Sequence, residues 1–303
     1  MVKKKIKKLV RNLGFHVYRA ERDDDRLRLS RLRGEHDCLV AGPFLGEFGW
    51  ELMQWQGYVR QLSKFYDKTI VYGRGSSEFF YRDFASEFRE TEVDSWDTTA
   101  YVLNGFDYAG WAQQFKDVDI LVADERTGYE LPLLFNQDFI PFGKPDKDRA
   151  YDVVVHARSI PDLGGNRKKK TRNWSTENWD ALCASLAGLK VAAVGIPELS
   201  YAPPGVVDLR GLDTGQVCSV LASSRCCIGP SSGLMHLASL CRTPHLVWMS
   251  PRAGGRFGGT LYRYLRTWNP LATPVKVLTE MGWHPSPEYV REELHGFLDA
   301  GGE

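Results

Sequence analysis

The stretch Cys226-Cys227-Ile228-Gly229-Pro230-Ser231-Ser232-Gly233-Leu234-Met235-His236-Leu237-Ala238-Ser239-Leu240 decides the fold. Its first residues are apolar and stop at a Gly-Pro pair, which predicts a short buried strand. Ser231 and Ser232 are common helix N-cap residues, and the apolar residues after them recur at helical spacing. A strand that turns directly into a helix presents free backbone N–H groups and the positive end of the helix dipole. The stretch therefore predicts an anion site, with phosphate as the usual anion; an ordinary strand–turn–helix joint is the alternative.

Strands and helices alternate on both sides of this stretch. We expect strands at 38–41, 68–73, 119–123, 151–158, 189–195, 208–211 and 245–249, and helices at 50–62, 76–88, 111–115, 175–186, 214–222 and 285–298. This order is typical of a parallel, doubly wound α/β sheet. A chain of 303 residues is long enough for two α/β domains of about 150 residues each.

The linker between the two domains is predicted at 128–150, a segment rich in Pro, Gly and Asp. We therefore divide the chain into an N-terminal segment, residues 1–33, a first domain, residues 34–145, and a second domain, residues 146–303.

The composition is that of a globular protein. The apolar content of 43% is ordinary, and the net charge of +1 gives no reason to expect a nucleic-acid partner. No run of 18 apolar residues occurs, so no membrane span is predicted. Six cysteines, at positions 38, 183, 218, 226, 227 and 241, show neither a CxxC pair nor zinc spacing. This pattern favours buried, reduced thiols and a cytoplasmic location.

The segment 1–33 differs from the rest of the chain. It holds twelve Lys or Arg residues against four acids, a balance of +8, so the remainder carries a net charge of −7. Ile6, Leu9, Val10 and Leu13 fall on one helical face among lysines, the pattern of a short amphipathic helix that lies on an anionic membrane surface. A solvated charged tail is the alternative.

Residues 228–238 have the sequence Ile-Gly-Pro-Ser-Ser-Gly-Leu-Met-His-Leu-Ala. This sequence resembles the donor-binding loop and helix of heptosyltransferase-like glycosyltransferases, the family 9 group. The resemblance implies the GT-B fold, in which two Rossmann-like doubly wound domains face each other across a cleft. It also implies a nucleotide-sugar donor on the second domain, held by Ser231, Ser232, Gly233 and His236. A glycan or glycolipid acceptor and a general base would then lie on the first domain.

Glu47 is the predicted general base. The residues Leu-Gly-Glu-Phe-Gly-Trp-Glu-Leu, 45–52, resemble the heptosyltransferase pattern in which an acid after glycine precedes a helix, although that acid is Asp in the family. A carboxylate in a cleft suits deprotonation of a sugar hydroxyl. Gly46, Trp50 and Glu51 are assigned to the acceptor side, with Glu51 as the reserve base. An acid that stabilises the next helix by its charge is the alternative for Glu47.

Further donor contacts are predicted in the second half. Arg172, two residues before Trp174, resembles the family's phosphate-binding cation, and cations replace metal in stabilising the leaving diphosphate of GT-B enzymes. The strand end His156-Ala157-Arg158 resembles the GDP-fucose motif of fucosyltransferases, in which Arg grips the diphosphate. Glu198 follows a strand and is assigned to the ribose hydroxyls.

Neither a metal nor another cofactor is predicted. Asp23-Asp24-Asp25 contains the DxD of metal-dependent glycosyltransferases, but it lies in a charged segment and follows no buried strand. The sequence thus favours a metal-independent, inverting glycosyltransferase at the cytoplasmic face of a membrane. A fucosyltransferase-like enzyme that uses GDP-fucose, a non-catalytic nucleotide-sugar-binding module and a nucleotide-sugar epimerase are the alternatives.

Overall fold

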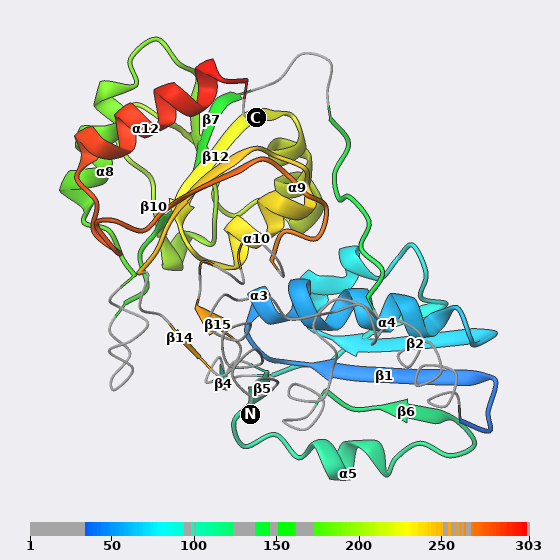
Figure 1. The fold of residues 1–303 in the computed structure, drawn as a ribbon. Helices are drawn as coiled ribbons and strands as arrows, with labels where there is room; N and C mark the ends of the chain where they lie inside the picture. Colours follow the sequence, from blue (N-terminus) through cyan, green and yellow to red (C-terminus); the bar gives the residue numbers. More distant parts are fainter. Residues whose placement is uncertain are drawn as a thin grey trace, which may run out of the picture.

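Two parallel β-sheets, one in each half of the chain, form the framework of the computed structural model (Figure 1). The structure describes residues 34–93, 98–99, 101–123, 137–145, 151–161, 172–250, 254–255, 258–259, 261, 264 and 268–301. The segment 1–33, the loop 162–171 with its run of lysines, and most of the predicted linker lie outside these residues, so the predictions made for them, including the domain boundary, stay predictions.

The first half contains a four-stranded sheet in the order β3-β2-β1-β6. Its strands are β1 (Cys38–Phe44), β2 (Lys68–Gly73), β3 (Glu87–Glu90) and β6 (Asp119–Leu121), and all of its pairings are parallel. Strand β1 is buried almost throughout because it is a central strand of continuous apolar sequence. Between the strands lie the helix α3 (Phe48–Trp50), the π-helical turn η1 (Glu51–Trp55), the helices α4 (Gln56–Ser63) and α5 (Tyr108–Ala112), and the 3₁₀ helix η2 (Gly75–Phe80). A small hairpin joins β4 (Thr98–Thr99) to β5 (Val102–Leu103).

The second half contains a six-stranded parallel sheet in the order β11-β9-β7-β12-β13-β16. Its strands are β7 (Tyr151–Val155), β9 (Val191–Ala193), β11 (Val207–Asp208), β12 (Ser224–Pro230), β13 (His245–Trp248) and β16 (Val275–Leu278). The helices are α8 (Thr176–Ser185), α9 (Thr214–Ala222), α10 (Gly233–Leu240) and α12 (Pro287–Asp299), with the 3₁₀ helix η3 (Pro197–Leu199). Two short antiparallel pairs complete it, β8 (Ala157–Arg158) with β10 (Ser200–Tyr201) and β14 (Gly254–Gly255) with β15 (Gly258–Gly259).

Helices cover both faces of the six-stranded sheet (Figure 1). Alternate residues of β7 show this, because Val153 and Val155 pack in one core cluster with α8 and α12, whereas Val154 packs in another with α9 and α10. The helix starts follow capping rules: Ser175 and Ser286 accept backbone N–H groups of α8 and α12, and Asp213 forms a capping box with Gln216 at α9.

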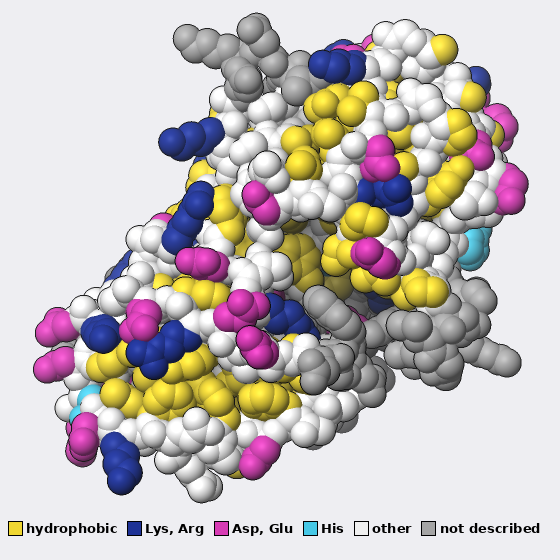
Figure 2. Space-filling view, turned by 180° about the vertical axis from the view of Figure 1, so that it is seen from behind, with side chains coloured by type: hydrophobic (Ala, Val, Ile, Leu, Met, Phe, Trp, Pro, Cys, Tyr) yellow, Lys and Arg dark blue, Asp and Glu magenta, His cyan; other side chains and the backbone are white. Residues whose placement is uncertain are grey.

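The second of these clusters continues from α9 and α10 into the first half of the chain, so the two halves share a core. Figure 2 shows the far side of the molecule, where hydrophobic side chains are visible in the hollow between the two halves. The backbone N–H of Phe142 donates to the carbonyl of Leu240 on α10, and Thr214 on α9 donates to the carbonyl of Ser76. The segment 137–142 also bonds to the first half, because the N–H of Asp138 donates to the carbonyl of Gly57 on α4.

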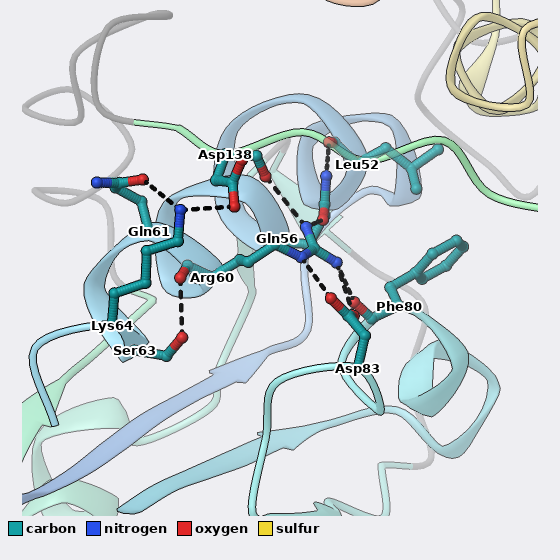
Figure 3. Close-up of polar contacts among 9 residues, drawn as sticks. All are labelled: Leu52, Gln56, Arg60, Gln61, Ser63, Lys64, Phe80, Asp83 and Asp138. Atoms are coloured by element: carbon teal, nitrogen blue, oxygen red, sulfur yellow. Dashed lines mark hydrogen bonds and ion pairs between the residues drawn. The ribbon is translucent and has the colours of Figure 1, made fainter. Parts of the chain in front are cut away.

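A buried arginine ties this crossing segment to the first half (Figure 3). Arg60, which is 3% exposed, pairs with Asp83 at 2.9 Å and donates to the backbone carbonyls of Phe80 at 2.8 Å and Asp138 at 3.2 Å. Lys64 pairs with the Asp138 carboxylate at 2.9 Å. A guanidinium can serve three segments at once because its five donors lie in a fixed plane.

The parallel α/β prediction is confirmed, and so is the decisive stretch, in which β12 passes directly into α10 with Ser232 at the N-cap. The helix predicted through Phe88 is wrong. The 3₁₀ helix ends at Phe80, and Phe88 lies on β3, where it packs against Tyr81. The four phenylalanines of 79–88 imitate helical spacing, but they enter the core from a turn and a strand.

Candidate functional site

The two halves touch where α3 meets the N-terminus of α10 (Figure 1). A Cβ atom added at Gly233 would lie 2.8 Å from Cδ1 of Phe48, and one added at Gly49 would lie 3.0 Å from Cδ2 of His236. A side chain at either position would force Phe48 or His236 to shift, so glycine allows this close approach of the two halves. This contact brings the carboxyl ends of β1 and β12 together, the place where parallel sheets bind ligands.

Glu47 lies at this junction, between the end of β1 and the start of α3. It is the N-cap residue of α3, with φ −69° and ψ 135°, but its side chain makes no capping hydrogen bond. Its negative charge raises the pKa of both Arg158 and Arg172, which opposes the effect of burial on each. The carboxylate therefore lies within electrostatic range of two arginines from the other half of the chain.

Arg158 is a fixed cation in the site. Its side chain is 7% exposed, and Nη1 donates to Oδ1 of Asn173 at 2.6 Å. Asn173 is held in turn by the backbone of Ile160, which donates to Oδ1 and accepts from Nδ2. Burial lowers the pKa of Arg158 to about 10, and the charge of Arg172 adds to this effect. Arg158 thus stays protonated at neutral pH, in an orientation that Asn173 sets.

Arg172 is the second cation. It lies on the exposed side of the site, with its guanidinium 5.2 Å from the centre of the Trp283 ring, a cation–π contact. Partial desolvation lowers the pKa of Arg172, and Glu47 opposes the shift. Arg172 also contributes to the lowered pKa of His236, after burial and His245, so it lies near the start of α10 as well.

The anion site is predicted at the N-terminus of α10. Ser231 is buried, and its backbone N–H donates to the carbonyl of Trp248 at 3.0 Å. Ser232 is the N-cap residue, but its side chain makes no capping bond, and its buried Oγ has no hydrogen-bond partner in the described part of the chain. Gly233 begins the helix. The first turn of α10 consequently offers N–H groups and a hydroxyl to a ligand.

Two neutral histidines flank these groups. His156 donates from Nδ1 to the carbonyl of Val194 at 3.2 Å, because a carbonyl can only accept, and burial lowers the pKa of this histidine to about 4. His236 is 7% exposed and packs against Trp268 with 4.8 Å between ring centres; burial, then His245 and Arg172, lower its pKa to about 3. Both imidazoles are uncharged at neutral pH and can act as hydrogen-bonding groups.

The remaining predicted residues lie further from these charges or face inward. Glu198 is exposed on η3 and lies near Arg210. Trp50 is partly buried, with its ring edge-on to Tyr101. Glu51 is 2% exposed and accepts hydrogen bonds from Ser77 at 2.8 Å and Tyr81 at 2.7 Å. Burial raises the pKa of Glu51 to about 7, against the lowering effect of these hydrogen bonds and of Arg74. The Glu51 carboxyl offers almost no surface to an acceptor, and its predicted acceptor-binding role stays a prediction.

Three residues at the site escaped the sequence analysis. Asn173 orients Arg158, Trp283 supports Arg172, and Arg74 donates to the carbonyls of Leu45 and Gly46, directly before Glu47. Asn173 stands beside a predicted site residue, so its position was a usable signal. Arg74 directly follows the predicted strand 68–73, at the kind of strand end where parallel sheets bind ligands, so its position was also a usable signal. Trp283 has no such signal, because it reaches Arg172 from a distant part of the chain.

The arrangement suits an anionic ligand. Two arginines and a helix N-terminus lie near one carboxylate at the junction, which is a setting for a diphosphate beside a group that can accept a proton. Within the residues that the structure describes, no three His, Cys, Asp or Glu side chains are grouped so that they could hold a metal ion.

No protein-family model matches the chain. No curated protein matches its sequence. Its fold is similar to that of three solved structures that cover 88% of this chain. The Escherichia coli ADP-heptose LPS heptosyltransferase II matches over 100% of its own chain, with a TM-score of 0.57 and 16% identity. A family 9 glycosyltransferase from Veillonella parvula matches over 98% of its chain, with a TM-score of 0.55 and 11% sequence identity. The E. coli heptosyltransferase WaaC with ADP matches over 99% of its chain, with a TM-score of 0.52 and 12% sequence identity. The predicted GT-B fold of two Rossmann-like halves is confirmed.

Proposed function

We propose that this protein is a metal-independent, inverting glycosyltransferase that moves a sugar from a nucleotide-sugar donor to a glycan or glycolipid acceptor. One observation carries the proposal: the charge of Glu47, from the first half, acts on both Arg158 and Arg172, from the second half, beside the start of α10. The fold supports it, since the three similar structures are named as heptosyltransferases or glycosyltransferases and one of them is a complex with ADP.

The reaction follows from these positions. Glu47 takes the proton of an acceptor hydroxyl as that oxygen forms a bond to the anomeric carbon of the donor sugar. The bond from the anomeric carbon to the phosphate oxygen breaks, and its electron pair leaves with the nucleoside diphosphate. Arg158, Arg172 and the N–H groups of α10 stabilise the charge that develops on the leaving oxygen. A single displacement of this kind inverts the anomeric configuration.

The nature of the donor is tested by thermal-shift screening against UDP-, GDP-, ADP- and CMP-sugars, followed by product analysis with and without glycan or glycolipid acceptors. We expect a nucleoside diphosphate and a glycosylated acceptor to form only when both substrates are present. Conversion of the donor sugar without an acceptor would identify an epimerase, and binding without any turnover would identify a binding module. A GDP-fucose-dependent enzyme is the second candidate, because Arg158 lies at the end of β8 as in the fucosyltransferase-like motif; selective stabilisation by GDP-sugars would favour it.

Turnover is expected to survive EDTA. The described residues bring arginines and a helix N-terminus to the junction, and these groups can stabilise a leaving diphosphate without a cation. The measurement is the initial rate before and after exhaustive chelation. Loss of activity that manganese or magnesium restores would contradict the proposed metal-independent mechanism.

Residues 1–33 are proposed to add affinity for an anionic membrane surface, which would place the enzyme at the cytoplasmic face of a membrane. The proposal rests on their +8 balance beside four apolar residues at helical spacing. In the part of the chain that the structure describes, no helix has both the length and the apolar character needed to span a bilayer.

We expect the full chain to sediment with vesicles that contain phosphatidylserine, and the chain lacking 1–33 to remain in the supernatant while keeping its thermal unfolding transition. Vesicles of phosphatidylcholine alone serve as the control, because they lack the anionic charge. Equal pelleting of the two proteins would contradict the membrane role. Unfolding of the shortened protein would show that the segment belongs to the fold.

A further inference from the structure

A second polar network lies directly behind the loop that carries Glu47. Arg74, the N-cap residue of η2, donates from Nη1 to the carbonyl of Gly46 at 2.8 Å and from Nη2 to the carbonyl of Leu45. These two carbonyls immediately precede Glu47 and belong to buried residues. A planar guanidinium fits two successive carbonyls because its donors are held in a rigid fork.

The same loop is held from its other side. Glu51 accepts hydrogen bonds from Ser77, on η2, and from Tyr81, just after it. Its carboxylate also raises the pKa of Arg74, against the effect of burial. The backbone N–H groups of Trp50 and Glu51 both donate to the carbonyl of Glu47, at 2.9 and 3.2 Å. The chain on both sides of Glu47 is therefore fixed to η2, so the backbone of Glu47 has little freedom to move.

We propose that Arg74 is a positioning residue that holds Glu47 in its orientation toward Arg158 and Arg172. The proposal rests on the proposed function, since it gives Glu47 the role of base. Arg74 donates to these two carbonyls, so we expect it to act on the reaction through the loop. A displacement of about 1 Å in a catalytic group can lower a rate about 100-fold, and two lost hydrogen bonds in this loop allow a displacement of that size.

The test is a double-mutant cycle, in which Arg74→Gln is made in the natural protein and in the Glu47→Gln variant. In the natural background we expect kcat to fall about 100-fold, with KM for the donor changed less than about two-fold. In the Glu47→Gln background we expect a further loss below about two-fold, because a group that acts through Glu47 has nothing left to position. Arg74→Lys keeps the charge but replaces the two-nitrogen fork by a single nitrogen, so we expect a loss of about 10-fold. It keeps the test valid if Arg74→Gln does not fold.

Hydrogen exchange supplies a readout that needs no substrate. Arg74→Gln should speed exchange of the Trp50 and Glu51 amides at least about 10-fold and leave the amides of β12 unchanged, as expected for local opening. Arg89→Gln is the matched control, since Arg89 is an exposed arginine in the same half that pairs with Glu87. It should change neither the exchange nor the rate.

The outcomes separate the two proposals. Equal losses from Arg74→Gln in both backgrounds, or no loss in the natural one, would overturn the positioning role. Unchanged exchange at Trp50 and Glu51 would also overturn it, whatever the rates. Normal turnover by Glu47→Gln alone would overturn the proposed base; faster exchange in Arg74→Gln would then still show that Arg74 holds the loop.

Discussion

Glu47→Gln is expected to lower the rate of sugar transfer by about 10²–10⁴-fold, the usual loss when a general base is removed. Glutamine keeps the size and the hydrogen-bonding capacity of the side chain but cannot take the proton of the acceptor hydroxyl. Donor binding should not weaken, because the proposed contacts to the diphosphate come from Arg158, Arg172 and the start of α10, and removal of a nearby negative charge does not disfavour an anion. Calorimetry with the nucleoside diphosphate that the donor screen identifies, paired with a transfer assay, measures both quantities.

Arg172→Ala is the matched contrast, with the opposite pattern. It removes a charge-assisted contact to phosphate, so donor affinity should fall by about 10- to 100-fold. Near-normal turnover of Glu47→Gln would remove Glu47 as the base and direct the search to Glu51 or to an acid in residues 91–125. A Glu47→Gln variant that loses donor binding as strongly as Arg172→Ala would show that the two residues do not have separate roles.

The second large effect is a loss of stability in acid caused by three buried histidines. The pKa of His236 falls from 6.5 to about 3, and those of His156 and His245 fall from 6.5 to about 4, in each case chiefly through burial. The folded state therefore binds fewer protons than the unfolded state below pH 6.5, and its stability falls as the pH drops toward these values. Once the pH has fallen to the folded-state pKa values, this effect lowers the free energy of unfolding by about 3–5 kcal/mol for each histidine.

Glu51 acts with the opposite sign. Its pKa is raised from 4.5 to about 7, so the folded state binds an extra proton between these values, and stability rises by about 3 kcal/mol as the pH falls through this window. At pH 5–6 the three histidines outweigh the single acid by at least about one proton. We thus expect the free energy of unfolding to fall by at least about 1.4 kcal/mol per pH unit on acidification.

Urea denaturation between pH 4.5 and 8 measures these slopes. His245→Asn keeps a donor for the Thr243 carbonyl but does not titrate. The slope of its unfolding free energy against pH should therefore be smaller by the contribution of one proton, whatever its stability at any one pH. Glu51→Gln should become steeper in acid and should be relatively more stable above pH 7. Slopes that neither substitution changes would contradict the assignment of the pH dependence to these groups.

The parts of the fold and of the site that could be predicted are those whose determining residues lie close together in the sequence. The strand–turn–helix at 224–240 follows from an apolar run, a Gly-Pro stop and helical spacing, all within one stretch. Glu47, Arg158 and Arg172 could be named because each follows or precedes a recognisable element. Their meeting could not be predicted from spacing, since it depends on the Gly49–Gly233 contact between the two halves.

Glu51 shows the limit of the same reasoning. Its place one turn after Glu47 made it a reserve base, but the turn that begins at Glu51 is a π-helix and its side chain points to Ser77 and Tyr81. A change from 3.6 residues per turn redirects every side chain in that turn, and no residue type in 51–55 signals it.

The crossing segment 137–142 has a consequence for recombining this chain with its structural relatives. Its Asp138 is bonded to Gly57 and Arg60 of the first half, and its Phe142 is bonded to Leu240 of the second. At Gly143, which follows, φ is +77°, and an added Cβ atom would lie 2.3 Å from the carbonyl oxygen of Cys218. A chimera that takes its second half from another protein would break one set of these bonds wherever the junction falls within 137–143. The two halves are thus poor interchangeable modules unless the crossing segment and its partners on α4, α9 and α10 are transferred with them.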